Sequence, residues 1–265
     1  MGVRGLMSYC KEIRKKANMN IPKNLGLDAF SLIFLFRERR DDFKAYLTTL
    51  LSLGHTIAFV MDKRAQKEKK ETVDERKQIR SDAKQEAGDL LTFTQTTDFD
   101  DLDEDQRRVL EKHLELKRRD AWCLYSEYVK WLKDMLAELK ITLIMAKEEA
   151  DTVLAKGGYD AVVTSDSDLL IHGVKSLWIP RGVGVQHNEI NHEEFLNHLG
   201  LSQEQLYEMA FLAGCDVQPK KFVDIQAAVS LLKFYGNLAT IQKRRGILTE
   251  QDLEAFTHFR KNAWV

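Results

Sequence analysis

Proline is scarce in this sequence, with three residues in 265, and only three cysteines are present. A chain so poor in proline can run through long helices without interruption. Cys10, Cys123 and Cys215 stand far apart, and their spacing matches neither a disulfide framework nor a zinc site. We therefore expect a reducing location inside the cell, in the nucleus or the cytoplasm.

Excess charge and long apolar runs are also missing. The 40 Lys and Arg residues balance the 41 Asp and Glu residues, which excludes a uniformly basic nucleic-acid binder but not one with segregated charges. No apolar run approaches the roughly 20 residues of a membrane span, and "MGVRGLMSYC" lacks the apolar core of a signal peptide. With 44% hydrophobic residues, the chain is expected to fold as one large or two small globular domains.

Five short apolar runs alternate with helix-like stretches. Runs of this kind, bounded by polar turns, are typical of buried strands in a parallel sheet. We predict an α/β fold with a mainly parallel central sheet flanked by helices, and further helices over residues 202–214 and 222–233. The predicted strands are residues 25–28, 56–62, 141–145, 159–164 and 176–179.

Carboxylates follow four of these five runs. Because ligands gather beyond the carboxyl ends of parallel strands, we expect the acidic side chains to share one edge of the sheet. Like charges that are held together and partly buried require a cation, and carboxylate oxygens suit Mg²⁺ or Mn²⁺. The acids concerned are Asp28, Asp62, Glu149, Asp151, Asp166 and Asp168.

A long insertion, residues 63–140, separates the second run from the third. It opens with a basic stretch, residues 63–80, that holds eight Lys or Arg and four Asp or Glu. Helical periodicity over residues 107–140 predicts one long amphipathic helix. A basic stretch is usually a solvated helix face, but this one starts beside a carboxylate strand end, where a metal-bound polyanion would need positive partners.

Six short motifs, in this order, resemble those of the flap endonuclease and XPG-type 5′ nucleases, a family with a PIN-like core. They are "MGVRGL", "GLDAFSLIF", "AFVMDK", "AKEEADTVLA", "AVVTSDSDLLIHG" and "FLAGCDVQP", and the resemblance runs from residue 1 to about residue 238. It implies a nuclease core over residues 1–218, with the insertion 63–140 as a helical arch. Residues 219–265 resemble a degenerate helix-two-turn-helix.

The resemblance also implies a mechanism and its residues. Two Mg²⁺ ions, replaceable by Mn²⁺, would bind the acids above together with Asp216. Lys69 and Arg76 match the pair that touches the scissile phosphate, in a register that the basic neighbours leave open by one turn. Phe34 matches an aromatic that stacks on a base, with core packing as the alternative interpretation. Other candidates for nucleic-acid contact are Gly2, Lys63, Arg64, Lys70, Lys77, Arg80, Lys220 and Lys221.

The segment "KKFVDIQAAV" departs from the family, because it lacks the glycines of the hairpin that binds duplex backbone. Without them, backbone amides cannot approach a phosphate as closely. The remaining chain lacks the sliding-clamp peptide of many members, so clamp binding is not expected. No membrane partner is expected either, and we expect the protein to be a monomer. We predict a magnesium-dependent flap endonuclease-like enzyme, with endonuclease or 5′-exonuclease action on DNA in replication, repair or recombination.

Two other functions stay open. The virion host shutoff proteins, RNA endonucleases of the same fold that degrade mRNA, carry a segment similar to "TSDSDLL", although the basic insertion favours DNA. A non-catalytic nucleic-acid-binding scaffold is the second, and the presence of all seven matched carboxylates argues against it. His187 and His192 flank "NEIN" and are expected in a surface loop, because no third ligand stands at metal spacing.

Overall fold

The computed structural model describes residues 3, 5–63, 70–96, 99, 101–147, 149–215 and 220–263, without the side chains of residues 70–73, 75, 76 and 261–263. Contacts divide the chain into two units. The first comprises Met1–Arg64 and Lys133–Val265, and the second is Ala65–Leu132. In the described part of the chain, no helix is both long and apolar enough to cross a membrane.

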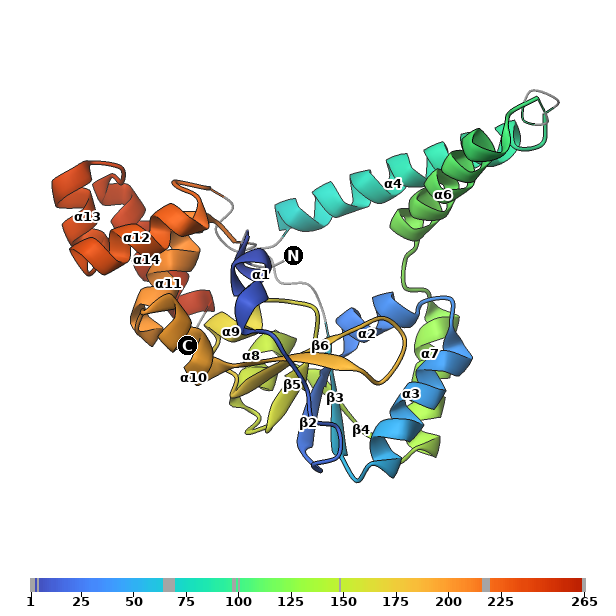
Figure 1. The fold of residues 1–265 in the computed structure, drawn as a ribbon, viewed down its shortest axis with the longest axis horizontal. Coiled ribbons are helices and arrows are strands. Elements are labelled where there is room, and N and C mark those ends of the chain that lie inside the picture. The colour runs from blue at the N-terminus through green and yellow to red at the C-terminus, as the bar shows by residue number, and fades with distance from the viewer. Residues whose placement is uncertain are drawn as a thin grey trace. The chain divides into compact units, whose positions relative to one another are not determined.

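A seven-stranded sheet forms the centre of the first unit, in the order β1-β7-β6-β5-β2-β3-β4 (Figure 1). The five strands from β6 to β4 are parallel, while β7 pairs antiparallel with β6 and β1 pairs antiparallel with β7. The predicted mainly parallel sheet flanked by helices is thus confirmed. The strands are β1 (Lys15–Lys16), β2 (Asn24–Asp28), β3 (Thr56–Asp62), β4 (Thr142–Ala146), β5 (Ala161–Val163), β6 (Ser176–Pro180) and β7 (His187–Asn191).

Helices cover the sheet and continue into a C-terminal helical region. In the first unit they are α1 (Leu6–Tyr9), the 3₁₀ turn η1 (Cys10–Ile13), α2 (Ala29–Phe36), α3 (Arg40–Ser52), α8 (Ala150–Lys156), α9 (Asp168–Ile171), α10 (His192–Leu199), α11 (Gln203–Ala213), α12 (Ile225–Tyr235), α13 (Leu238–Arg245) and α14 (Glu250–Ala263). The second unit contains α4 (Lys70–Phe93) and α6 (Glu104–Ala121), and α7 (Ser126–Glu138) belongs to both units.

Successive side chains of β2 point to opposite faces of the sheet, and each face packs against its own hydrophobic layer. A Cβ atom on Gly26 would lie 2.6 Å from the ring of Tyr159 and 2.9 Å from Leu154, so only glycine fits where α8 packs on the sheet. On the layer formed with α2 and α3, the rings of Phe36 and Phe43 stack at 4.7 Å between centroids. Both layers are apolar, which holds the strand ends in fixed positions.

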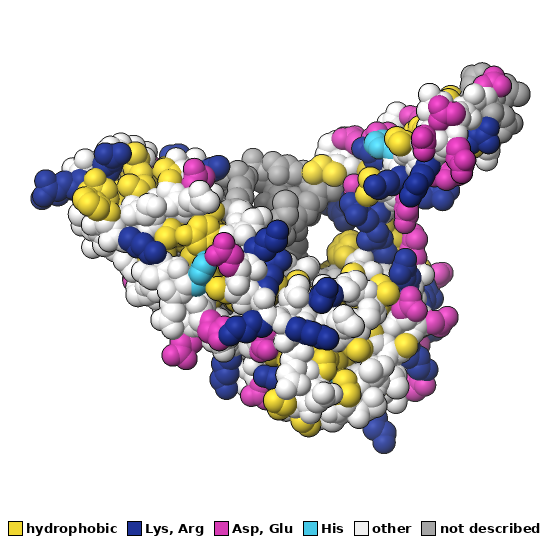
Figure 2. All heavy atoms as spheres, in the orientation of Figure 1, with side chains coloured by type: hydrophobic (Ala, Val, Ile, Leu, Met, Phe, Trp, Pro, Cys, Tyr) yellow, Lys and Arg dark blue, Asp and Glu magenta, His cyan; other side chains and the backbone are white. Residues whose placement is uncertain are grey.

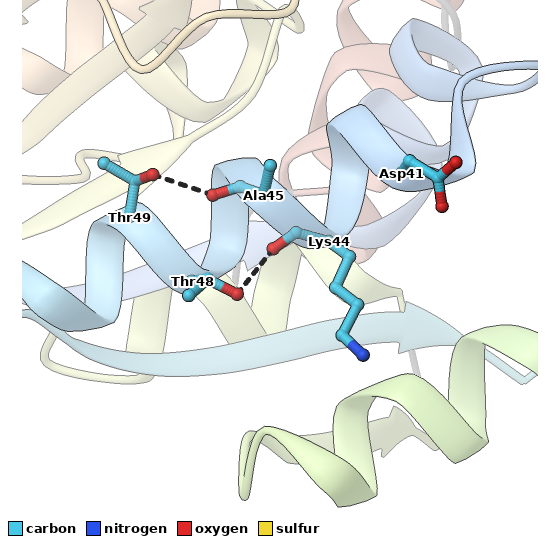
Figure 3. A pocket seen from close by; sticks show the side chains of 5 residues that line it. All are labelled: Asp41, Lys44, Ala45, Thr48 and Thr49. Atoms are coloured by element: carbon cyan, nitrogen blue, oxygen red, sulfur yellow. Dashed lines mark hydrogen bonds between the residues drawn. The ribbon is translucent and has the colours of Figure 1, made fainter.

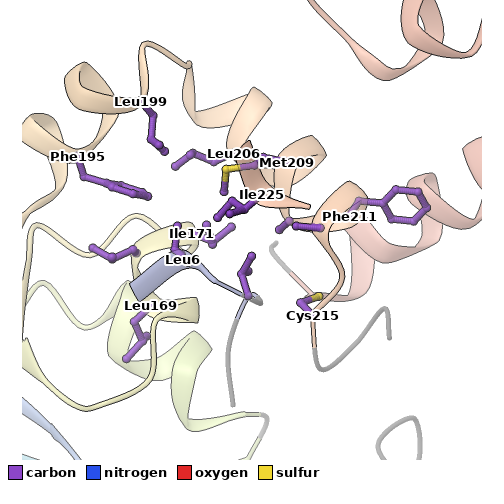
Figure 4. Close-up of a cluster of buried hydrophobic side chains, with 14 of the residues drawn as sticks. Leu6, Leu169, Ile171, Phe195, Leu199, Leu206, Met209, Phe211, Cys215 and Ile225 are labelled. Atoms are coloured by element: carbon purple, nitrogen blue, oxygen red, sulfur yellow. The ribbon is translucent and has the colours of Figure 1, made fainter. Parts of the chain in front are cut away.

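A large hydrophobic cluster joins α9, α10, α11 and α12 in the first unit (Figure 4). Leu169 and Ile171, just after the paired aspartates, are fully buried in it. The short helix α9 is therefore anchored by its apolar residues, and the turn that precedes it has little freedom to move.

Two predicted helices differ from the structure. The predicted helix over residues 107–140 is interrupted after α6, where Trp122 and Tyr125 pack edge-on against Tyr128. The helix predicted from residue 222 starts only at Ile225, because the Asp224 side chain accepts the Ala227 amide and caps it.

Candidate metal centre at the carboxyl edge of the sheet

Asp28 ends β2 and caps α2. Its Oδ1 accepts the amides of Phe30 and Ser31, at 3.0 and 3.3 Å, and its Oδ2 accepts the hydroxyl of Thr164 at 2.7 Å. Burial raises the pKa of this carboxyl to about 6. The bonds from Thr164 and Ser31 oppose that rise, and the neighbouring charges of Asp166 and Asp62 add to it.

Asp62 ends β3 and connects it to the start of α8. Its Oδ1 accepts the Ala150 amide at 2.6 Å, so a carboxylate occupies the N-terminus of this helix. Glu149 is the N-cap residue of α8, and Asp151 lies in its first turn. The parallel pairing of β3 with β4 thus brings the second and third acidic segments together.

Asp166 and Asp168 occupy the turn between β5 and α9. The Asp168 amide donates to Asp166 Oδ1 at 3.0 Å. Asp168 is only 8% exposed, and its Oδ1 accepts the Val3 amide at 2.8 Å. The N-terminal segment therefore reaches the paired aspartates, whereas Gly2 and Asp216 lie outside the described residues.

The four acidic strand ends meet at one edge of the sheet, as expected for parallel strands. Within the described ranges, however, no three Asp, Glu, His or Cys side chains converge on one ion-sized position. The bonds described above hold Asp28, Asp62, Asp166 and Asp168 on nearby backbone amides. Each carboxylate has about four acceptor positions, so an amide bond does not exhaust it. An all-oxygen, strongly anionic donor set of this kind fits Mg²⁺ or Mn²⁺.

The structure describes only some of the predicted basic residues. Lys63 is exposed directly after β3, and Lys77 on α4 pairs with Asp74 at 3.0 Å. Both charge signs appear on the visible face of the α4 and α6 pair in Figure 2. Arg80 is half-buried on α4; Lys70 and Arg76 lie in this helix without described side chains, and Arg64 and Lys69 lie outside the described residues.

Two further predicted contacts fall in the C-terminal region. Lys220 pairs with Asp252 at 2.8 Å and lies 4.4 Å from the ring centroid of Phe222, so its charge is already engaged. Lys221 is exposed. Asp224 places a negative charge at the N-terminus of α12, which disfavours phosphate there.

Phe34 lies on α2 and is 39% exposed. The interpretation of this residue as a core side chain is therefore wrong. Base stacking stays a prediction for an aromatic ring that is partly open to solvent.

His187 does not lie in a surface loop. It starts β7, is fully buried, and its Nε2 lies 2.7 Å from the hydroxyl of Tyr46. The expectation failed because β7 contains only one strongly apolar residue, Ile190, and gives no apolar run to recognise. His192 starts α10 and bonds to Gln203.

A hollow on α3 lies apart from these acids (Figure 3). The hydroxyls of Thr48 and Thr49 bond to carbonyls of their own helix, and Lys44 pairs with Glu138 at 2.6 Å. These side chains are engaged in local bonds, so the hollow offers no arrangement for chemistry. Asp41 and Ala45 complete its lining.

Comparison with known proteins agrees with this geometry. The family model of the XPG I-region matches residues 140–216, which contain the Glu149–Asp151 and Asp166–Asp168 pairs. Flap endonuclease 1 of Picrophilus torridus is 30% identical over 113 residues, 37% of this chain and 33% of that protein. Flap endonuclease 1 of Ignicoccus hospitalis is 24% identical over 301 residues, 98% of this chain and 81% of that protein.

The fold also has solved counterparts. The catalytic core of Rad2 in complex with DNA substrate superimposes with a TM-score of 0.63 over all of this chain and 81% of the Rad2 chain, at 18% identity. The match to the Picrophilus torridus enzyme spans about a third of that relative's length. The I-region match, the flap endonuclease relatives and the shared fold thus all show similarity of this chain to the XPG and flap endonuclease-type nucleases.

Proposed function

We propose that this chain is a metal-dependent, structure-specific 5′ nuclease that hydrolyses phosphodiester bonds of DNA. The observation that carries the proposal is the meeting of four acidic strand ends at one edge of the sheet. Burial and the charges of Asp62 and Asp166 together raise the pKa of Asp28. A bound divalent cation would offset this repulsion between the carboxylates. The similarity to flap endonucleases and to the XPG I-region supports nuclease chemistry rather than a scaffold.

The donor set determines what the metal would be. Bound Mg²⁺ would supply Lewis-acid stabilisation of the phosphate and a water of lowered pKa as nucleophile. Glu149, Asp151, Asp166 and Asp168 are the proposed inner ligands. Asp28, Asp62 and Asp216 are proposed to bind directly or through water.

The remaining residues would hold and neutralise the substrate. The Val3 amide fixes one oxygen of Asp168, so that its carboxylate keeps one orientation. Lys69 and Arg76 are proposed to offset the charge that builds on the scissile phosphate. Asp224 is acidic and Lys220 is ion-paired with Asp252, so we expect the C-terminal region to bind duplex backbone weakly.

Substitution of one ligand tests the proposal. Asp168→Asn keeps the size and one acceptor oxygen but removes the charge, and we expect cleavage of a 5′-flap DNA to fall at least about 10³-fold at saturating Mg²⁺. Binding of the same DNA, measured by fluorescence anisotropy, is expected to persist. Substantial cleavage by this variant would refute the assignment.

A matched control lies at the other end of β5. Asp160 is exposed and accepts the Asn24 amide at 2.9 Å. Asp160→Asn makes the same chemical change away from the carboxyl edge, so cleavage is expected to stay within about twofold of the wild type. An equal loss in both variants would point to damage to the fold rather than to a metal site.

A further inference from the structure

Thr164 is a fully buried polar residue that joins two of the acidic turns. It follows β5 directly, and its amide donates to the Trp178 carbonyl at 3.1 Å, which holds its backbone against β6. Its hydroxyl donates to Asp28 Oδ2 at 2.7 Å, and the same oxygen accepts the Asp166 amide at 3.0 Å. One side chain thus contacts a predicted ligand on β2 and the backbone of another after β5.

The direction of these bonds is determined by chemistry. The Asp166 amide can only donate, so Thr164 Oγ1 is the acceptor and its single proton points to the Asp28 carboxylate. Hydrogen bonds to a charged acceptor are about twice as strong as neutral ones. The hydroxyl therefore stabilises one rotamer of Asp28 and one path of the Asp166 backbone together.

A second link joins the same two turns nearer the surface. The Ser165 amide donates to Ser31 Oγ at 2.8 Å, and the two serine hydroxyls lie 2.8 Å apart. Ser31 also donates its amide to Asp28. The turn after β2 and the turn after β5 are thus connected by a buried contact and an exposed one.

We propose that Thr164 is a positioning residue, which orients Asp28 and the Asp166 turn so that both can act on the same bound divalent cations. This inference depends on the proposed function, because it concerns ligands of the proposed centre. Groups that orient metal ligands typically change metal affinity or activity by 10–100-fold when they are removed. The exposed serine link is expected to matter less, because water can replace its bonds.

The test replaces the hydroxyl of Thr164 by a methyl group and keeps the shape of the side chain. Thr164→Val removes the donor to Asp28 and the acceptor for Asp166, whereas Thr164→Ser keeps both. The control is Thr56→Val on β3, where the hydroxyl bonds to Asn24 Oδ1 at 3.3 Å at the opposite end of the sheet. Mn²⁺ binding to the protein alone is measured by electron paramagnetic resonance, and cleavage of 5′-flap DNA gives kcat and KM.

We expect Thr164→Val to weaken Mn²⁺ binding at least tenfold and to lower kcat with KM nearly unchanged. Thr164→Ser should restore most of both, and Thr56→Val should behave like the wild type. Mn²⁺ binding by Thr164→Val equal to that of the wild type would overturn the proposal, as would equal losses in the serine and valine variants.

Folding is followed separately by thermal unfolding. If Thr164→Val does not fold, Thr164→Ala takes its place, and failure of both to fold would mean a structural role and overturn the proposal. A wild-type protein that binds no Mn²⁺ would instead contradict the proposed function itself.

Discussion

His187 is a buried titratable residue whose environment disfavours its charged form. Its ring lies 5.4 Å from that of Trp178, and its Nε2 bonds to the Tyr46 hydroxyl. Burial, with a smaller contribution from the charge of nearby His55, lowers its pKa to about 4. Protons therefore bind the unfolded chain more readily than the folded one between the two pKa values.

We predict that the contribution of His187 to the free energy of unfolding falls as the pH is lowered from about 6.5 to about 4, opposite in sign to the contribution of Asp28, whose pKa is raised. At roughly 1.4 kcal/mol per pKa unit, the loss from His187 alone is about 3 kcal/mol. His187→Gln should remove this contribution, so that at pH 4 relative to pH 6.5 the variant loses less stability than the wild type, or gains more, measured by urea unfolding at several pH values. His258→Gln, at an exposed position on α14, should leave the slope unchanged, and an unaltered slope in His187→Gln would contradict the assignment.

Single residues also mark the limit of prediction from this sequence. Asp28 and Asp168 were predictable because each stands at the end of an apolar run that is typical of a buried strand. The groups that hold them were not, since Thr164 is 136 positions from Asp28 and Val3 is 165 positions from Asp168. Such contacts depend on strand order, which periodicity does not encode.

Among the elements, those with strong local signals agree well with the prediction. β3 covers residues 56–62, as predicted, and Ser202 with Gln205 forms the capping box that starts α11. β1 and β7 were missed because they are polar. The break between α6 and α7 was missed because aromatic packing, rather than proline or glycine, interrupts the helical period there.

Helix α4 carries Arg76, one of the two proposed phosphate contacts, whereas Lys69 lies outside the described residues. We predict that the double variant Lys69→Ala and Arg76→Ala lowers kcat for 5′-flap DNA by about 10²-fold or more, since donors aimed at developing charge contribute factors of this size. Mn²⁺ binding to the protein alone should be unchanged.

The control for this helix is Lys84→Ala. Lys84 is exposed on the same helix and has no proposed role. Its variant should cleave within about twofold of the wild type. If Lys84→Ala and the double variant lose activity equally, the effect comes from the general basicity of the helix and not from two specific contacts.

At the scale of the whole molecule, charge is balanced but unevenly distributed. The net charge is −1, yet residues 63–80 hold eight basic and four acidic residues. In a nearly neutral protein, a segregated basic region of this kind is the expected source of electrostatic attraction for a polyanion. Affinity for DNA should therefore come from few ion pairs, and the acids at the sheet edge would oppose it until cations bind.

This balance leads to a prediction about substrate and salt. With Mg²⁺ present, we expect cleavage of a 5′-flap DNA and at least tenfold slower cleavage of a single-stranded RNA of the same sequence. Because release of counterions drives binding to phosphates, KM for the flap should rise several-fold between 50 and 200 mM salt, while kcat changes little. Initial rates on matched labelled substrates measure both effects, and Ca²⁺ in place of Mg²⁺ separates binding from cleavage. Faster cleavage of the RNA would assign the enzyme to mRNA degradation, and a KM independent of salt would remove the basic stretch from the binding surface.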